Sequence, residues 1–452
     1  MNESPVLDML ERYVRRSGAR WHMPGHKGIQ PARGTFLDWA YDITEVGEML
    51  EHPNPIERSQ QFMAKSYGVD RTWYSVQGAT LPVMAGILAA FPPHSTLWVD
   101  RILHRSVLSA LVLGRYQVRW LYPAMLSDDI ILPLTEISPN FSGAQGLVLT
   151  HPTYDGLAKD LRDVIGRAHQ GGLAVLVDEA HGSHWLGDSF PTSAVAAQAD
   201  LVAHGTHKTE ASLTQTGLLH LQGGRVSADD IDRWWRLLAT SSPSYLLLAS
   251  LDRLQWQRRQ PQYGRQWRAL ADRVRGLWNT IENQGAVVLQ SWAERHGFEA
   301  DPARLTIFGR GAELRSKLAS VGEVEKVTPS TCTLILAPGQ DLSIIEKALS
   351  GIDFREAKIA LTMTQYPRLN TAMPIHRAWN QAGQWVPLRE AQGCVVKDAL
   401  TPYPPGVPMA VPGEILSREM IEWLTQWMAA AAVPVHGLKY QEGNAMVWVV
   451  DQ

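Results

Sequence analysis

Short apolar runs alternate with helical stretches between about Val69 and Gln222, and this alternation limits the possible folds more than any other feature. The runs have the length of buried strands: Thr72–Val76, Thr96–Val99, Val118–Tyr122, Gly146–Thr150, Leu173–Val177, Leu201–Ala203 and Leu218–Leu221. Helical patterns lie between them at Leu81–Phe91, Arg105–Gly114 and Leu157–Gln170. Strands joined by helices predict an α/β fold, in which helices cover both faces of a mostly parallel seven-stranded sheet.

The pattern predicts three regions along the 452 residues. Residues 1–56 contain an amphipathic helix at Pro5–Ser17 and an irregular arm, which is typical of a segment that wraps the surface or reaches across a subunit interface. Residues 57–265 form the large domain, and residues 266–452 form a smaller α+β domain whose second part begins near Leu388. The elements predicted in the smaller domain are a long first helix at Gln266–Gln284, strands Arg304–Phe308, Thr331–Leu336 and Ala445–Val450, and helices Leu342–Leu349 and Ser417–Ala431.

Composition excludes several classes of protein. The chain has 42 basic and 45 acidic residues, and neither sign gathers in a block that would favour nucleic acid or an anionic membrane. Its two cysteines, Cys332 and Cys394, argue against a disulfide scaffold and fit a reducing cytosol. No run reaches the roughly 18 apolar residues of a membrane helix, and the charged N-terminal stretch differs from a signal peptide. We therefore expect a cytoplasmic protein that binds neither nucleic acid nor membrane.

An acidic residue closes one of the predicted strands. Asp178 follows the apolar residues AVLV and begins the segment Asp178-Glu179-Ala180-His181-Gly182. A carboxylate at the end of a buried strand is costly unless it meets a partner. That partner could be the protonated ring nitrogen of pyridoxal 5'-phosphate (PLP), which a carboxylate keeps effective as an electron sink. A helix N-cap or a metal ligand would explain the residue equally well at this point.

A lysine follows the next predicted strand. Strand Leu201–Ala203 leads into His204-Gly205-Thr206-His207-Lys208. A lone lysine is usually a surface charge, but partial burial beside other cations lowers its pKa, as Schiff-base chemistry requires. Lys208 comes 208 − 178 = 30 positions after Asp178, which is one strand-to-strand step. Because ligands of open α/β sheets bind at the carboxyl ends of strands, the two residues together indicate a PLP site.

Two further segments follow predicted strands. Gln77-Gly78-Ala79-Thr80 opens a helix, where a glycine permits close approach and free N–H groups can hold a phosphate. His104 could stack on a cofactor ring, although a capping or core histidine fits the position equally well.

Eight motifs occur in an order that is typical of one enzyme family. They are His22-Met23-Pro24-Gly25-His26-Lys27-Gly28, Asp42-Ile43-Thr44-Glu45, His104-Arg105-Ser106-Val107, Pro152-Thr153-Tyr154 with Gly156, Asp178-Glu179-Ala180-His181-Gly182, Thr206-His207-Lys208, Thr240-Ser241-Ser242-Pro243-Ser244-Tyr245, and Pro402-Tyr403-Pro404-Pro405-Gly406-Val407-Pro408 with Pro412-Gly413-Glu414. On these motifs, which cover most of its length, the chain resembles the Orn/Lys/Arg decarboxylases. These are prokaryotic PLP enzymes of fold type I, and the chain looks like their short form without a wing domain.

The resemblance implies a role for each matching residue. Lys208 would be the Schiff-base lysine, Asp178 the partner of the ring nitrogen and His104 the ring-stacking residue. His181 would lie near the cofactor oxygen and the substrate, and His207 is a second candidate for proton transfer. The residues implied to hold the phosphate are Gly78, Ala79, Thr80, Thr206, His207 and, from the partner subunit, Thr240. A homodimer is the smallest assembly implied, because fold type I sites lie at a dimer interface.

The implied reaction is α-decarboxylation of arginine, lysine or ornithine to a polyamine-type amine and CO2. The distal cation of such a substrate needs a carboxylate, and Asp42, Glu45 and Glu414 are candidates because they lie within the motifs. Other chemistry on the same scaffold stays open at this stage, because fold does not fix function. The alternatives are transamination or lyase chemistry, decarboxylation of a non-basic amino acid, and a PLP-binding paralogue without turnover.

Some positions depart from the family pattern near the expected cofactor. Gln77-Gly78-Ala79-Thr80 replaces the usual Asn-Gly-Thr-Thr and is followed by Leu81-Pro82, in which proline is tolerable in a first helical turn. Arg105 stands where the family has a lysine, and Asp155 stands where a second aromatic residue is frequent. These changes put the identity of the substrate in doubt more than the binding of PLP.

Overall fold

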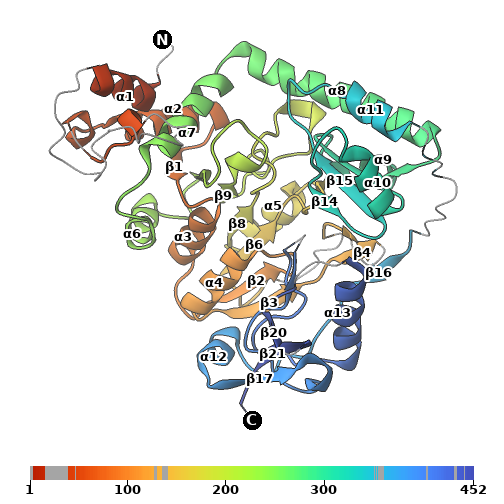
Figure 1. Cartoon of the computed structure of the whole chain (residues 1–452). Coiled ribbons are helices and arrows are strands. Elements are labelled where there is room, and N and C mark those ends of the chain that lie inside the picture. The colour runs from red at the N-terminus through yellow and green to blue at the C-terminus, as the bar shows by residue number, and fades with distance from the viewer. Residues whose placement is uncertain are drawn as a thin grey trace. The chain divides into compact units, whose positions relative to one another are not determined.

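A computed structural model of the chain describes residues 4–15, 39–45, 47–126, 130–134, 141–350, 352, 354, 361–403, 406–431, 435–441 and 443–451. The chain separates into two compact units. The first unit comprises Met1–Ala90, Leu176–Leu186 and Ser193–Ala269, and the second comprises Phe91–Val175, Gly187–Thr192 and Leu270–Gln452. Figure 1 labels the elements. The motif His22–Gly28 and residues Pro404 and Pro405 lie outside the described residues.

The predicted seven-stranded sheet is confirmed, with the strand order β1-β10-β9-β8-β6-β2-β3. Each strand begins and ends within one residue of its prediction: Arg71–Ser75 (β1), Thr96–Asp100 (β2), Gln117–Leu121 (β3), Gly146–Thr150 (β6), Ala174–Asp178 (β8), Leu201–His204 (β9) and Gly217–Leu221 (β10). β2 pairs in parallel with β3 and β6, and β8 pairs in parallel with β9. β10 runs antiparallel to both β9 and β1. The loop from β9 to β10 contains only the 3-10 turn Thr206–Lys208 (η4), which is too short for a parallel crossover.

The helices of the first unit include one that is capped at both ends. Helix α2 (Pro55–Tyr67) begins with a capping box, in which Asn54 accepts from the N–H of Glu57 while the Glu57 carboxylate accepts from the N–H of Asn54. Gly68 ends the helix in the left-handed conformation, with φ +72°. The other helical elements of this unit are Pro5–Arg15 (α1), Trp39–Tyr41 (η1), Gly47–Leu50 (η2), Thr80–Ala90 (α3), Ala228–Leu238 (α6), Tyr245–Arg258 (α7) and the start of Pro261–Asn283 (α8).

One of the predicted helices of the second unit begins later than expected. Leu157–Gln170 was predicted as a helix throughout, but Leu157–Ala158 forms strand β7, which pairs with Glu299–Ala300 (β12). Helix α5 begins only at Arg162 and runs to Gln170. Gly156, at φ +78°, turns the chain into β7, so tertiary pairing overrides the local helical pattern here.

The remaining elements of the second unit build several small sheets. One has the order β11-β13-β15-β14 and another the order β17-β21-β20. The elements are Arg105–Leu113 (α4), Ala124–Leu126 (β4), Ile130–Ile131 (β5), Gly187–Ser189 (η3), Val287–Val288 (β11), Leu289–Arg295 (α9), Arg304–Phe308 (β13), Gly311–Leu318 (α10), Lys326–Val327 (β14), Thr331–Ile335 (β15), Ser343–Leu349 (α11), Met363–Gln365 (β16), Ile375–Asn380 (α12), Gly383–Pro387 (β17), Leu388–Glu390 (η6), Thr401–Pro402 (β18), Arg418–Ala431 (α13), Val435–His436 (β19), Leu438–Gln441 (β20) and Asn444–Val450 (β21).

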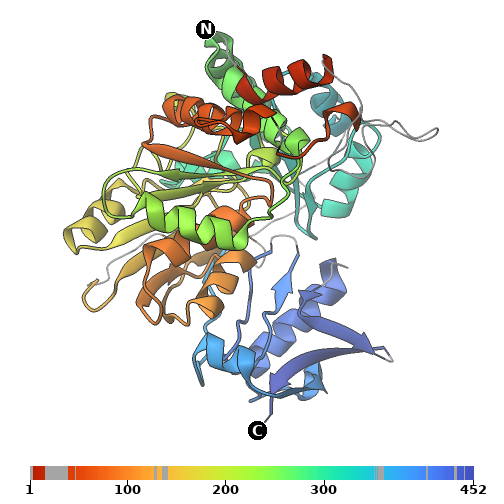
Figure 2. The ribbon, with the colours of Figure 1, turned by 90° about the vertical axis from the view of Figure 1, so that its left-hand side faces the viewer.

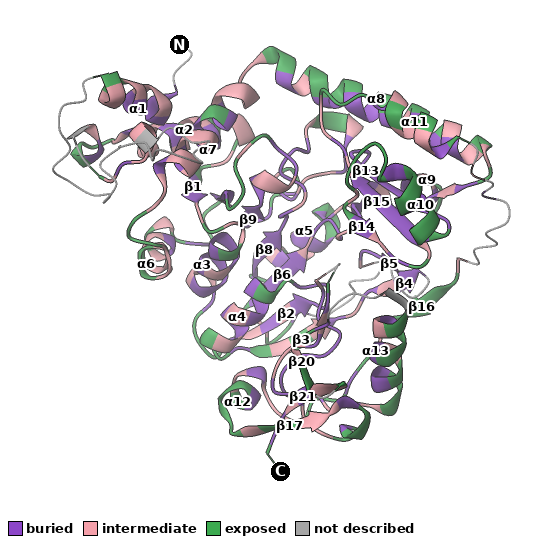
Figure 3. Cartoon of the chain, in the orientation of Figure 1, coloured by how far each residue is buried: buried purple, intermediate pink, exposed green. Residues whose placement is uncertain are grey.

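The C-terminal part of the second unit packs in one apolar cluster that also includes Ile102, Met125 and Ile131. Helix α13 lies against the β17-β21-β20 sheet, as Figure 2 shows. Its residues Met420 and Leu424 pack in one cluster with Val447 and Val449 of β21. Buried strands such as β8, β9 and β13 are coloured purple in Figure 3. These strands give each unit a rigid frame for the loops that follow them.

Candidate active site

The ends of β8 and β9 bring three of the predicted catalytic residues together in the first unit. Asp178 is the last residue of β8, and Lys208 ends the turn that follows β9. The Nζ atom of Lys208 lies 3.0 Å from Nε2 of His181. Burial raises the pKa of Asp178. The charge of Lys208 acts in the opposite direction, as does the hydrogen bond of 3.2 Å that Asp178 Oδ1 accepts from the N–H of Ala180. A lysine, a histidine and a buried carboxylate therefore share this edge of the sheet.

A group of hydroxyls surrounds Thr206 in the turn after β9. The Thr206 side chain is fully buried, and its Oγ1 lies 3.0 Å from that of Thr216 and 2.9 Å from Oγ of Ser212. His207 donates from Nδ1 to the carbonyl of Thr216 at 2.7 Å, which leaves its Nε2 as the acceptor nitrogen. Burial, followed by the charge of Lys208, lowers the pKa of His207, so the ring stays neutral near pH 7.

The loop before α3 has the backbone shape that a phosphate site requires. Gly78 adopts φ +62°, and a Cβ atom there would lie 3.8 Å from Cε1 of His207. Helix α3 begins at Thr80, so Pro82 lies in its first turn, where a missing N–H costs little. The backbone of Gly78 thus lies close to His207, at the N-terminal end of a helix that can bind an anion.

Gln77 connects this loop to the Thr240 segment of the same chain. Its Oε1 accepts from the backbone N–H of Thr240 at 2.9 Å, and its Nε2 donates to the carbonyl of Leu238 at 3.4 Å. The Thr240 hydroxyl accepts from the N–H of Ser242 at 3.2 Å, and the residue is exposed. The departure from the family pattern at Gln77 therefore gives the loop a partner within its own subunit.

These residues fit PLP at both ends of the cofactor. No hydrogen bond from the described residues reaches Oδ2 of the buried Asp178, which leaves an acceptor for a ring N–H. The hydroxyl of Thr206 and the N–H groups at the start of α3 are donors of the kind that phosphate prefers, and Nε2 of His207 joins them only when the ring is protonated, a state that a bound phosphate would favour. Lys208 supplies the amine that would bond to the cofactor aldehyde.

A buried hydrogen-bonded chain that the sequence did not reveal lies beside this site. Glu179 accepts from the N–H of Ala194 at 2.7 Å, and its Oε2 lies 2.8 Å from Nε2 of His204. Nδ1 of His204 lies 3.1 Å from Nε2 of His220, whose Nδ1 lies 2.8 Å from Oγ1 of Thr72. All four side chains are at most 1% exposed.

A second buried group packs against this chain. The ring of Tyr67 lies 5.2 Å from that of His204 and 4.3 Å from that of His220, and the guanidinium of Arg258 lies 3.7 Å from the Tyr67 ring. The Glu210 carboxylate forms an ion pair with Arg258 and accepts hydrogen bonds from the hydroxyls of Tyr67 and Tyr263. Glu210 follows Lys208 by two positions, but nothing in the local sequence indicates its distant partners.

Two of the predicted substrate acids lie in the first unit, in the segment 39–45. Asp42 is partly exposed and Glu45 is exposed. The charge of Glu45 contributes to a raised pKa of Tyr245, after burial of the phenol itself. Both carboxylates are therefore accessible to a ligand.

Three other residues of interest lie in the second unit. His104 caps α4 by accepting from the N–H of Ser106 at 3.2 Å and is exposed at the wall of a cavity of about 820 Å³. Glu414 is buried and paired with Arg101 at 3.2 Å. Asp155, one of the departures from the family pattern, forms a buried ion pair with Lys326. The carboxylates of Glu414 and Asp155 thus already have cationic partners.

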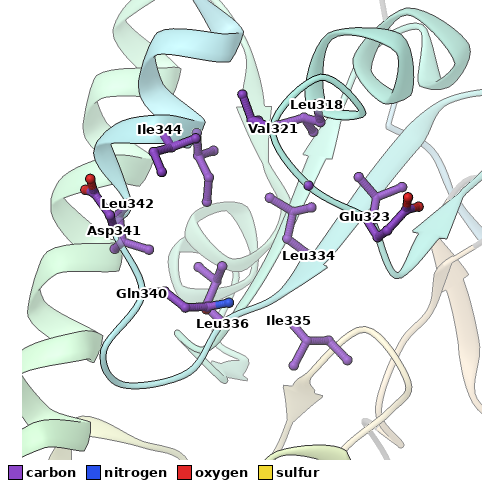
Figure 4. Close-up of a pocket in the computed structure, with 13 residues that line it drawn as sticks. Leu318, Val321, Glu323, Leu334, Ile335, Leu336, Gln340, Asp341, Leu342 and Ile344 are labelled. Atoms are coloured by element: carbon purple, nitrogen blue, oxygen red, sulfur yellow. The ribbon is translucent and has the colours of Figure 1, made fainter. Parts of the chain in front are cut away.

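A separate cavity of about 240 Å³ lies between α10, β15 and α11 (Figure 4). Its walls are mainly aliphatic, with Leu318, Leu334 and Ile344 among them, and its carboxylates are Glu323 and Asp341. It holds no candidate catalytic residue. Among the described residues, no three His, Cys, Asp or Glu side chains gather as they would around a metal ion, and no helix is long and apolar enough to cross a membrane.

Comparisons with known proteins identify the family of the chain. The family model "Orn/Lys/Arg decarboxylase, major domain" matches residues 4–295, and the model of its C-terminal domain matches residues 356–451. The chain belongs to the Orn/Lys/Arg decarboxylase family. It is 30% identical to an arginine decarboxylase of Bacillus subtilis, with 96% of each chain covered, and 22% identical to the lysine decarboxylase LdcA of Pseudomonas aeruginosa, with 97% of this chain and 78% of that one covered.

Solved structures support the same fold for this family member. The constitutive lysine decarboxylase of Escherichia coli matches with a TM-score of 0.82 at 20% identity, over 100% of this chain and 82% of that one. The serine palmitoyltransferase of Sphingomonas wittichii matches with a TM-score of 0.51 at 15% identity, over 77% of this chain. The chain is thus an amino-acid decarboxylase of fold type I that uses PLP, and both the recognition of the family and the predicted cofactor are confirmed.

Proposed function

We propose that this enzyme removes the α-carboxylate of a basic amino acid as CO2, with arginine as the first substrate to test. The observation that carries the proposal is the 3.0 Å contact between Lys208 Nζ and His181 Nε2 beside the buried carboxylate of Asp178. Arginine is favoured because the relatives that match at 29–30% identity are named arginine decarboxylases, whereas those named lysine decarboxylases match at 20–22%.

Each residue of the site would have a separate task. Asp178 would hold the ring nitrogen, Lys208 would bond to the aldehyde, and the loop Gly78-Ala79-Thr80 would hold the phosphate together with Thr206 and His207. When bound, PLP supplies the electron sink for the charge that CO2 leaves behind on Cα. Lys208 Nζ and His181 Nε2 are close enough to exchange a proton, so either can deliver one to the substrate Cα. His207 would serve the phosphate, as an imidazolium that the phosphate charge stabilises, rather than the proton transfer.

The substrate's distal cation would meet Asp42 or Glu45. These two carboxylates are accessible, whereas the charge of Glu414 is already balanced by Arg101. A guanidinium binds a carboxylate through two parallel hydrogen bonds, so loss of the correct acid should raise KM for arginine about tenfold or more. Asp42→Asn and Glu45→Gln test the two residues singly. If neither change moves KM, both assignments are wrong.

The assembly is proposed to be at least a homodimer. Thr240 is the residue through which a partner subunit would reach the phosphate, and its exposed side chain is consistent with that role. Thr240→Ala should weaken PLP binding. Co-expression of Thr240→Ala with Lys208→Ala chains would show whether one intact site forms across the two subunits.

The decisive experiment combines spectroscopy with product analysis. Purified enzyme with PLP should show a visible band that borohydride reduces, and CO2 should appear with arginine, lysine or ornithine but not with non-basic amino acids. Lys208→Ala should lose both the borohydride-stable label and CO2 release. Lys159→Ala, a lysine near Phe298 in the second unit, serves as the matched control. A band without CO2 from any basic amino acid would refute the proposed reaction while leaving the cofactor site intact.

A further inference from the structure

The buried chain Glu179–His204–His220–Thr72 has a defined set of donors and acceptors. His220 stays neutral, because burial and the neighbouring charges of His204 and Arg258 lower its pKa well below the usual value. A neutral His220 can accept at Nε2 and donate from Nδ1 to Thr72. His204 then has an acceptor for each of its two N–H groups, since Glu179 lies at Nε2 and His220 at Nδ1. The geometry therefore accommodates an imidazolium at His204.

The balance of buried charges also favours a cation at this position. Three buried carboxylates belong to this part of the first unit: Asp178, Glu179 and Glu210. Arg258 is paired with Glu210. Lys208 offsets Asp178 only while its amine carries a proton, and with PLP present the ring nitrogen would take over that task. A buried carboxylate is costly without a cation, and His204 is the basic side chain whose ring nitrogen meets Glu179.

We propose that Glu179, His204 and His220 form a relay that holds one proton on His204, and that this charge cancels the charge of Glu179 and keeps Asp178 ionised for the ring nitrogen of PLP. The inference rests on the proposed role of Asp178. His204 does not touch the cofactor in this scheme, so it is a positioning residue that acts through its neighbours. The ring of Tyr67 is tilted against both imidazoles and packs beside the relay, and the charged groups around it are Glu179, Asp178, Arg258 and Glu210.

The sign of the effect follows from the charges. Burial already pushes the pKa of Asp178 upward, and an uncompensated Glu179 beside it would push that pKa further. Without His204, Asp178 would therefore become protonated at a higher pH than in the wild type. PLP binding that needs an ionised Asp178 would then weaken first at the acidic end of the range and recover as the pH rises.

The test measures the affinity of the apoenzyme for PLP from pH 6 to pH 9 through the visible band. For His204→Gln we expect PLP binding about tenfold weaker than in the wild type at pH 6.5, and this difference in affinity should narrow toward pH 9. The midpoint of the curve of PLP affinity against pH should shift upward by about one pH unit. The double variant Glu179→Gln with His204→Gln removes both charges, so its affinity should return to within about threefold of wild type. His184→Gln is the matched control, because His184 is also buried but packs on Trp267 outside the relay.

A second measurement reads the proton directly. Nitrogen-15 NMR of histidine-labelled apoenzyme should show both ring nitrogens of His204 protonated at pH 7, with the signal assigned from its loss in His204→Gln or His204→Asn. A neutral His204, an equal loss of affinity at every pH, or a double variant as weak as His204→Gln would each overturn the relay. If Asp178→Asn binds PLP as tightly as wild type and with the same pH dependence, the role of Asp178 fails, and that result is distinguishable from a failure of the relay alone.

Discussion

Arg101→Leu should lower the opening free energy of the second unit strongly, and this loss should become smaller as the pH falls. Arg101 and Glu414 are buried side chains, 1% and 2% exposed, whose charged atoms lie 3.2 Å apart. At an effective dielectric constant of 20, that separation corresponds to about 5 kcal/mol of attraction. Arg101 also donates to the carbonyls of Pro408 at 2.6 Å and Met409 at 3.3 Å, and both would lose this donor.

In the Arg101→Leu variant, the carboxyl group of Glu414 can reduce the loss of stability by taking up a proton. Burial already raises the pKa of Glu414, and Arg101 offsets this only in part, so the loss of Arg101 raises the pKa further. Neutralising a carboxyl of ordinary pKa 4.5 costs about 3.4 kcal/mol at pH 7 and about 1.4 kcal/mol at pH 5.5. A group whose folded-state pKa is raised loses stability as the pH rises. Together with the two carbonyls, the expected deficit of Arg101→Leu is about 4–5 kcal/mol at pH 7 and about 2–3 kcal/mol at pH 5.5.

Hydrogen exchange gives the local opening free energy, which suits a chain of two units better than a single unfolding midpoint. Peptides that cover residues 406–416 and 96–103 should be followed at both pH values. Glu414→Gln is the matched control. This variant leaves a buried guanidinium that cannot lose its proton. Its loss of opening free energy should be similar to that of Arg101→Leu at pH 7 and nearly the same at pH 5.5. Equal deficits for Arg101→Leu at both pH values would show that Glu414 does not take up the proton, and the reasoning would be refuted.

Two further predictions concern single residues. Gly78→Ala places a side chain at φ +62° and should weaken PLP binding about fivefold or more in a spectroscopic titration, whereas Gly68→Ala carries similar strain at φ +72° away from the site and should leave PLP affinity unchanged. Burial raises the pKa of the Cys332 thiol to about 11, so a thiol reagent at pH 8 should label Cys394 first in the native protein, and early labelling of Cys332 by mass spectrometry would contradict its burial.

The sequence pattern predicted the strands of the large sheet better than the places where a segment departs from its local pattern. The strands of the large sheet were found within one residue because short, continuous apolar runs bounded by turn residues are typical of buried strands. The prediction that a helix begins at Leu157 was wrong, because Gly156 turns the chain and β12 supplies a pairing partner about 140 residues later. Asp178 and Lys208 were predicted because each directly follows a strand, and their catalytic roles stay a prediction. His181 was implied only by the family resemblance, and the structure places its Nε2 3.0 Å from Nζ of Lys208.

The buried relay beside the site depends on strand register, which local sequence does not encode. Thr72 of β1 lies directly opposite His220 of β10, and Leu218, two residues before His220, lies opposite His204 of β9. Residues opposite one another, or two apart in one strand, point to the same face of a sheet, so this register brings Thr72, His220 and His204 together. A parallel β10, as an unbroken strand–helix pattern would suggest, would separate them. The antiparallel turn between β9 and β10 therefore provides two features at once, since it places Thr206, His207 and Lys208 at the sheet edge and brings His204 and His220 to one face of the sheet.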